Sequence, residues 1–529
     1  GWNLSGLDLS GTDLNQSELQ GSDLCKANLS RSFLMYATIY NARLIGANLS
    51  CAFMPAIDLH DSDLSHADLN GAYLPINYLV NSNLTGADLS GSTMDQAMMD
   101  NSTLVGARLN GTSLWAAKIS YANMTGASLI KAFMSRATFQ NSQLNGTNLT
   151  GAVLVGANLV NATISNADLS GADLSASRCG GANFVGSKLA KSILGFANLT
   201  GTNLSMANLS GSYLAASSLE DSDLTKANLS DANLENAFMS RVRLVGAKLP
   251  GASLRGTHLD DSDLSNSNLE NADLTNALLR RCNLIDANLN GSRFLDADLS
   301  SAILDGAYMT GTNMMGAKMS WVDLNGSSLT NCQFTRSELF GANLSNSDLT
   351  GSDFTRAYLV RANLSGCTLK GVNLDYADLT SAILRNAKLS KTRLEHVYMN
   401  NADLSGADLT GATLYSMNLN GTSMRKASLR AAVLNVFNLD EVDLRGVDLR
   451  DARMCRGAMN NVNLSGSDLR GANLTEMALT GVDLQGANLD GIKYDPLTLQ
   501  SLAGCDLGAA RIDADLRKDL DRLRGENGV

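Results

Sequence analysis

The sequence has few of the residues from which most globular cores and catalytic sites are built. It holds 4 prolines and 4 histidines among 529 residues, and aromatic residues make up 5%. No apolar run approaches the 18 or more residues that a membrane-spanning helix needs, and no basic-then-apolar segment opens the chain as a secretory signal would. We therefore expect no membrane span.

The charge balance lacks the basic excess of a general nucleic-acid or anionic-membrane binder. The net charge is −11, which is mild for this length. Proteins that bind nucleic acid through its phosphates normally carry a basic patch or a basic balance. The composition therefore predicts no nucleic-acid partner.

The cysteines lack the spacing of a disulfide framework or of a metal site. There are eight, with no CxxC pair and no other short pair among them. This pattern is typical of a reducing compartment, so we expect a cytoplasmic protein. The cysteines are Cys25, Cys51, Cys179, Cys282, Cys332, Cys367, Cys455 and Cys505.

A five-residue repeat occupies most of the chain. From Leu4 to Tyr494, every fifth residue is almost always leucine, and no insertion breaks the register. These 99 positions hold 76 Leu, 13 Met, 5 Phe and 3 Ile, with Cys179 and Tyr494 as the other two. The residue two places earlier is small, the one between is commonly Asp or Asn, and Ser or Thr and often Gly follow. The unit reads A(D/N)LSG.

A period of five fits neither a helix nor a flat strand. On an α-helix, steps of five rotate by about 140° and scatter the leucines around the axis. On a flat strand, the odd step puts successive leucines on opposite faces. All leucines point inward only if the chain turns a corner within each unit, and Gly, Asn and Asp suit such corners. The repeat therefore predicts a narrow solenoid with an aliphatic interior.

The unit A(D/N)LXX, present for example as Ala87-Asp88-Leu89-Ser90-Gly91, resembles that of the pentapeptide-repeat family. The resemblance covers about nine-tenths of the chain. It implies an all-β fold, a right-handed quadrilateral parallel β-helix with four repeats to a coil, and hence about 24–25 coils over on the order of 120 Å. We expect residues 1–494 to form the solenoid and residues 495–529 a C-terminal helical cap. The segment 494–499 is similar to those of long cyanobacterial members.

Both ends need covering, because a solenoid with open end coils exposes its core and its strand edges. Trp2 and Leu7 occupy positions that elsewhere hold small inward residues, which favours a plug over an end coil that merely tolerates bulk. Residues 497–502 could form a short helix after Pro496. Apolar residues then follow at spacings of four, four and three, which predicts an amphipathic helix of about 15 residues that caps the coil or forms a homodimer. They are Ile512, Leu516, Leu520 and Leu523.

The sequence offers no catalytic constellation. His60, His66, His258 and His396 are scattered, and His60 and His66 are expected on different sides of a coil, without clustered metal ligands. No phosphate-binding glycine motif follows a strand–helix pattern, and a filled solenoid offers no shaped pocket for a triad. We expect no enzyme, no cofactor and no metal site.

One side of the expected coil, that of Leu14, carries an apolar stripe in the N-terminal half. Beyond about residue 230 the same side turns polar. Such a stripe on a polar surface predicts an interaction site, although the residues could instead pack on one another as surface ladders. The stripe consists of Phe33, Met35, Tyr36, Phe53, Pro55, Tyr73, Pro75, Ile76, Trp115, Phe133, Val153, Val155, Ile193, Phe196 and Tyr213, with Tyr78 and Met98 on the adjacent side.

A second region, near the C-terminal end, is rich in arginine with interleaved Asp and Glu. It predicts an exposed surface of paired charges. Its basic residues are Arg425, Lys426, Arg430, Arg445, Arg450, Arg453 and Arg456.

These features predict a non-catalytic scaffold that binds a protein partner or a second copy of itself through the apolar stripe. The family resemblance implies an alternative, a DNA mimic that regulates gyrase or topoisomerase and protects it from quinolones. About 0.1 net charge per Å of the expected coil stack, against about 0.6 per Å of duplex, disfavours the mimic.

Overall fold

Each five-residue unit is a short extended segment followed by a corner in the computed structural model, which describes residues 1–435 and 438–526. The residue before each central position pairs in parallel with the residue 20 places later, as Asp13 does with Phe33 and Phe33 with Phe53. Four such pairing positions occur per 20 residues. The chain is thus wound into four-sided coils, with the central residue inside and the paired residue outside.

The corners explain why Gly, Asn and Asp recur in the repeat. At the corner after Leu84, Gly86 has φ 66°, and the N–H of Ala87 donates to the Leu84 carbonyl oxygen at 3.0 Å. A positive φ at the second central residue of a closed four-residue turn is the mark of a type II turn, which Gly and Asn adopt most readily.

A local hydrogen bond explains the Asp or Asn before the central residue and the Ser or Thr after it. The N–H of Ser90 donates to Asp88 Oδ1 at 3.0 Å, and the same bond recurs along the chain. At Asn83, the Thr85 hydroxyl also donates to Oδ1, at 2.7 Å. Asx and Ser/Thr side chains that bond the nearby backbone in this way favour turns over continuous strand.

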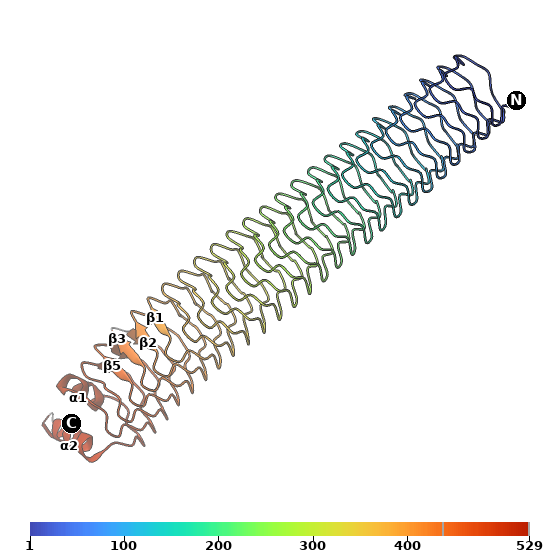
Figure 1. The fold of residues 1–529 in the computed structure, drawn as a ribbon. Coiled ribbons are helices and arrows are strands. Elements are labelled where there is room, and N and C mark those ends of the chain that lie inside the picture. Colours follow the sequence, from blue (N-terminus) through green and yellow to red (C-terminus); the bar gives the residue numbers. More distant parts are fainter. Residues whose placement is uncertain (436–437, 527–529) are drawn as a thin grey trace. The chain divides into compact units, whose positions relative to one another are not determined.

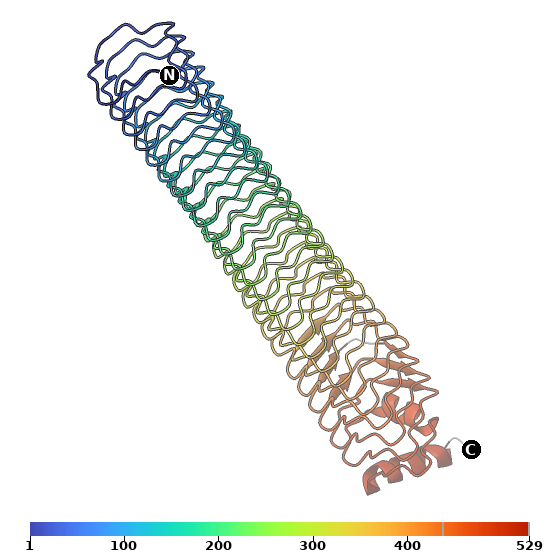
Figure 2. The same cartoon turned by 90° about the vertical axis from the view of Figure 1, so that its right-hand side faces the viewer.

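The chain forms two compact units, Gly1–Asn268 and Leu269–Val529, and in each of them the coils stack on one another (Figures 1 and 2). In the first unit the central residues are fully buried from Leu24 onward; each buried leucine contributes roughly 2 kcal/mol relative to exposure. The prediction of a parallel β-solenoid is confirmed within each unit.

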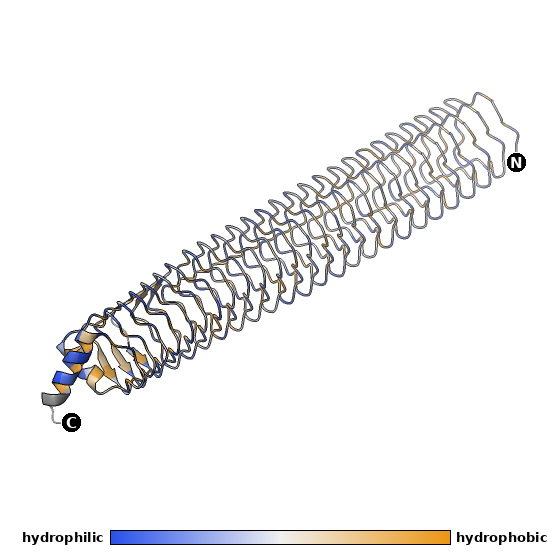
Figure 3. Ribbon diagram, turned by 90° about the horizontal axis from the view of Figure 1, so that it is seen from below, coloured by the Kyte–Doolittle hydropathy of each residue, from blue (hydrophilic) through white to orange (hydrophobic). Residues whose placement is uncertain are grey.

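The second unit contains the longer strands. They form two parallel sheets in the orders β1-β2-β3-β5 and β4-β6-β7. Figure 3 shows apolar and polar colours alternating along the ribbon. The strands are β1 (Arg393–Glu395), β2 (Thr413–Tyr415), β3 (Val433–Asn435), β4 (Asn438–Asp440), β5 (Arg453–Cys455), β6 (Ala458–Asn460) and β7 (Ala478–Thr480).

A larger inward residue follows five of these seven strands, where the repeat elsewhere mostly has Ala, Ser or Thr. Side chains of this size need more room at the corner, and β-branched residues favour extended backbone. At Val447, however, the turn is closed, because its N–H donates to the Leu444 carbonyl oxygen at 3.2 Å. A larger inward residue is therefore compatible with the longer strand but does not by itself produce it. The five residues are Val397, Met417, Val442, Val462 and Val482.

Two helices follow the repeat, as predicted. In α1 (Pro496–Ala503), Asp495 caps the N-terminus by accepting from the Thr498 N–H, and proline stands in the first turn. Strand pairing then resumes, with Asp506 beside Asp483, after a gap of 23 residues instead of 20. The inserted α1 accounts for the longer gap.

The second helix, α2 (Ala514–Glu526), packs against α1, which also contacts β7. Ile512 lies before α2, so the expectation that it belongs to the helix is wrong; the helix begins after Asp513, whose Oδ1 accepts from the Leu516 N–H at 2.8 Å. No helix among residues 1–435 and 438–526 is long and apolar enough to cross a membrane.

The interior predicts which thiols react. Cys179 replaces a central leucine, and Cys332 and Cys367 take the small inward position; burial raises the pKa of each of these thiols to about 12. Because the thiolate is the nucleophile, alkylation of the native protein at pH 8 should modify the exposed Cys51 and leave these three intact until denaturant is added. Mass spectrometry of the alkylated peptides measures this. Modification of Cys179 as fast as Cys51 would contradict a filled interior.

Candidate interaction surfaces

Three aromatic side chains stand on successive coils of the first unit and form what we call the aromatic ladder. Phe33, Phe53 and Tyr73 pair through their backbones. The ring centroids of Phe33 and Phe53 are 6.2 Å apart, and those of Phe53 and Tyr73 are 5.2 Å apart with an interplanar angle of 9°. The three residues still expose 48%, 39% and 44% of their surfaces. They therefore pack on one another and also present an apolar surface to solvent.

The rest of the predicted stripe is not continuous. On the same side, Thr93, Ser113 and Asp173 interrupt the column, which leaves two further pairs besides the ladder, Phe133–Val153 and Ile193–Tyr213. Val153 in the pair Phe133–Val153 is half-buried. Of the other predicted residues, five are exposed and five are half-buried, namely Met35, Pro55, Pro75, Met98 and Val155. The exposed five are Tyr36, Ile76, Tyr78, Trp115 and Phe196.

A hollow lies beside the aromatic ladder, on the next side of the same coils. It has a volume of about 400 Å³. It opens at a corner column where Ala56 stands on the coil between Tyr36 and Ile76, and the small alanine leaves the space free. We call it the tyrosine hollow. Its lining is Tyr36, Ala37, Thr38, Ala56, Asp58, His60, Tyr78, Val80 and Asn81.

The polar groups of the tyrosine hollow include a carboxylate and an imidazole, besides the Thr38 hydroxyl and the Asn81 amide. His60 Nδ1 lies 2.6 Å from Asp58 Oδ1, His60 Nε2 lies 3.8 Å from Asp61 Oδ2, and the His60 ring stacks on Tyr40 at 4.7 Å. No group of three or more metal-binding side chains occurs among the described residues. The repeat pattern could have indicated that Asp58 and His60 lie together, because the residues on either side of a central leucine, here Leu59, both point outward on one side of the coil.

The second unit carries an aromatic cluster that the predicted stripe does not include, because it lies on a different side from Leu14. Trp321 meets Phe340 edge-on at 5.3 Å, Phe340 stacks with Tyr358 at 6.4 Å, and the Arg361 guanidinium lies 5.8 Å from the Phe340 ring. A Cβ at Gly341 would lie 2.6 Å from the Trp321 ring, so the indole occupies space that glycine leaves open.

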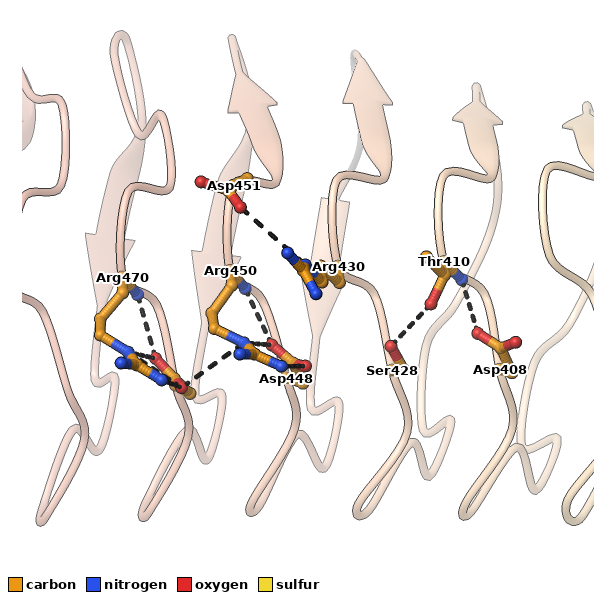
Figure 4. Close-up of polar contacts among 9 residues, drawn as sticks. Asp408, Thr410, Ser428, Arg430, Asp448, Arg450, Asp451 and Arg470 are labelled. Atoms are coloured by element: carbon orange, nitrogen blue, oxygen red, sulfur yellow. Dashed lines mark hydrogen bonds and ion pairs between the residues drawn. The ribbon is translucent and has the colours of Figure 1, made fainter.

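The arginine-rich region is a surface of paired charges (Figure 4). Arg450 Nη2 lies 2.6 Å from Asp448 Oδ2, Arg470 Nη2 lies 2.6 Å from Asp468 Oδ2, and Arg450 Nε lies 3.7 Å from Asp468 Oδ2. The Arg450 hydrogen bonds hold the pKa of Asp448 below its usual range, against the raising effect of burial. Arg450 and Arg470 are therefore already paired with carboxylates of the same chain.

The side chains at the two ends differ in burial. Trp2 and Leu7 expose 68% and 47% of their surfaces, and the central residue between them, Leu4, is partly exposed. Trp2 and Leu7 therefore do not plug the end coil in this structure. Leu516 and Leu520 are buried within the chain, while Ile512 and Leu523 are half-buried. The buried pair leaves little apolar surface on α2 for a homodimer, which stays a prediction.

Comparison with known proteins gives a family match along the chain. A family model described as pentapeptide repeats matches residues 3–35, 39–74, 78–115, 107–142, 134–171, 167–205, 202–241, 239–276, 277–316, 317–356, 347–386, 357–395, 387–425, 422–456 and 459–493. A search of the curated proteins found no matching sequence.

Solved structures with similar chains include HetL, a pentapeptide repeat protein involved in heterocyst differentiation regulation from the cyanobacterium Nostoc sp. Strain PCC 7120. It is 30% identical over 42% of this chain and 90% of its own, with a TM-score of 0.32. QnrB1, a plasmid-mediated fluoroquinolone resistance protein, is 20% identical over 40% and 95%, with a TM-score of 0.23. A pentapeptide repeat protein from the Arabidopsis thaliana thylakoid lumen is 21% identical over 27% and 88%, with a TM-score of 0.14. The family assignment rests on the sequence match.

The docking of α2 predicts a pH-dependent cap. Burial and the hydrogen bond that the Tyr494 hydroxyl donates to Asp519 Oδ2 at 2.9 Å raise the pKa of Tyr494 to about 12. A folded-state pKa above the unfolded value of about 10 means that this stabilisation is complete below pH 10 and is lost as the pH rises toward 12.

We expect the helical circular-dichroism signal to fall between pH 10 and 12 in the parent protein. Tyr494→Phe should weaken cap docking by about 1 kcal/mol at pH 7 and should reduce the fall between pH 10 and 12. Identical titration curves for the two proteins would show that this contact does not hold the cap.

Proposed function

Because this chain belongs to the pentapeptide-repeat family, we propose that it is a non-catalytic scaffold that binds a protein partner through the aromatic ladder and the apolar side chains beside it. The exposure of three successive aromatic rings on one side of the first unit is the observation that carries this proposal.

The aromatic ladder suits binding because its rings are held in place before any partner arrives. Each ring is flanked by a ring on at least one adjacent coil and fixed on a paired backbone. Ordering a side chain at an interface costs roughly 0.5–1.5 kcal/mol, and a stacked ring has already met part of that cost. Aromatic side chains are also the ones that interface centres favour.

The coil interior supports binding in preference to catalysis. Apart from the half-buried Gly457, its central and small inward positions are filled by buried side chains among the described residues from Leu24 to Leu489. A catalytic site would therefore have to lie in a shallow hollow on the outer surface of the coils. The tyrosine hollow holds a carboxylate and an imidazole, but the Thr38 hydroxyl that also lines it donates to the Ser17 carbonyl oxygen at 3.4 Å and not to either of them.

Mimicry of DNA stays an alternative prediction. In the second unit, Asp443, Asp448 and Asp468 each have an arginine partner within the chain. A mimic of the duplex needs carboxylates that are free to replace phosphates. This pairing gives the alternative no support.

Replacing the aromatic ladder tests the proposal. The variant Phe33→Ser/Phe53→Ser/Tyr73→Ser should capture at least tenfold less of the partner that the parent protein retains from native lysate, because truncating an interface aromatic often costs more than 1 kcal/mol. Quantitative mass spectrometry of the captured proteins measures the change.

The matched control is Phe238→Ser/Tyr308→Ser/Tyr398→Ser, which removes three exposed aromatics from equivalent outward positions elsewhere. It should retain the partner. Both variants should keep the parent's circular-dichroism spectrum, since only outward side chains change. Equal partner recovery by the ladder variant and the parent would rule out the aromatic ladder as the binding surface.

A further inference from the structure

The side of the coil that holds the tyrosine hollow has an unusual charge composition. Over five successive coils it carries four carboxylates and three tyrosines, and its sequence contains no lysine or arginine. The corresponding segments are residues 16–21, 36–41, 56–61, 76–81 and 96–101, the carboxylates belong to Glu18, Asp58, Asp61 and Asp100, and the tyrosines are Tyr36, Tyr40 and Tyr78.

The basic residues closest in the coil pattern leave this charge uncompensated. Arg43, on the adjacent side, is paired with Asp23 at 3.3 Å. Lys118 lies on the next coil beyond the five, beside Met98. The tyrosine hollow is thus an aromatic space with reachable negative charge and no lysine or arginine among its lining residues.

We propose that the tyrosine hollow receives an arginine side chain from the protein partner. This inference rests on the proposed function, because Tyr36 follows Phe33 at the next corner and a partner on the aromatic ladder reaches the tyrosine hollow directly. A guanidinium is planar, stacks on aromatic faces and donates in a fork that matches a carboxylate. Tyr36 and Tyr78 supply the faces, and Asp58 supplies the carboxylate.

The dimensions and the remaining lining fit a long side chain. A volume of about 400 Å³ is at the lower end of the range of ligand pockets, about 300–1,000 Å³. Ala56 and Val80 provide apolar surface for the methylene stem, as arginine prefers when its head is charged and its stem is covered. The Asp58 side chain is 29% exposed, so an incoming donor reaches it while His60 stays bonded to it.

A fluorescein-labelled nona-arginine peptide tests the inference on the full chain, with fluorescence anisotropy as the readout at two salt concentrations. Asp58→Asn should lower the affinity at least fivefold. Asp68→Asn is the matched control, because it removes the same charge from the opposite side of the coil and its carboxylate makes the same kind of turn bond, to the Asn70 N–H at 3.0 Å. It should lower the affinity less than twofold.

Two further arms separate stacking from charge. Tyr36→Ser/Tyr78→Ser leaves the charge unchanged and should also lower the affinity at least fivefold. A nona-lysine peptide, which has the same charge but no planar head, should bind at least threefold more weakly than nona-arginine. Equal losses for Asp58→Asn and Asp68→Asn would show that only bulk charge attracts the peptide, and the inference would fall.

A small molecule or a second copy of the chain in the tyrosine hollow would give different experimental results. If N-acetylarginine amide alone displaces the peptide at micromolar concentration, the tyrosine hollow is a small-molecule site and the inference is overturned. A dimeric mass in light scattering that Asp58→Asn reduces to the monomer would assign the site to a second copy, and would overturn it as well. The peptide assay needs no native partner, so its failure leaves the capture experiment on the aromatic ladder to decide the proposed function separately.

Discussion

Parallel pairing between residues 20 positions apart is the constraint on which the other features of each unit depend. The N–H of Leu24 donates to the Arg43 carbonyl oxygen at 2.7 Å, and this kind of bond repeats from coil to coil. It brings like positions together, so leucines stack inside and outward side chains form columns. The turn bond made by the Asp or Asn before each central residue maintains the corners that this register needs. A column of three aromatic residues thus becomes one surface, although 40 residues separate its ends.

Much of the fold could be predicted from the sequence because one strong periodicity determines it. A leucine every five residues requires a corner in every unit, and the helix after Pro496 follows from ordinary stop signals and apolar spacing. The side that carries Phe33, Phe53 and Tyr73 could also be predicted, since the 20-residue turn assigns each residue to a column. The start of α2 could not, because the carboxylate that caps it depends on local geometry after Ile512.

The tyrosine hollow and the aromatic cluster could not be predicted from column assignments alone. The hollow exists because one small residue, Ala56, lies beside larger ones on adjacent coils and because His60 turns onto Tyr40 and Asp58. The cluster depends on Trp321 lying over Gly341. Such features need side-chain rotamers and neighbours on three coils at once, and a repeat pattern does not specify them.

The most direct test of this account is the register itself, measured by cross-linking. Parallel neighbours on adjacent coils lie within the Cα separation that a disulfide spans, about 4.4–6.8 Å, whereas residues on different sides do not. Thr93 and Ser113 are such neighbours. Mild oxidation of Thr93→Cys/Ser113→Cys should give the 93–113 disulfide in peptide mass maps, and Thr93→Cys/Arg108→Cys should give none between its introduced cysteines. A disulfide in the second variant and not in the first would contradict the 20-residue coil.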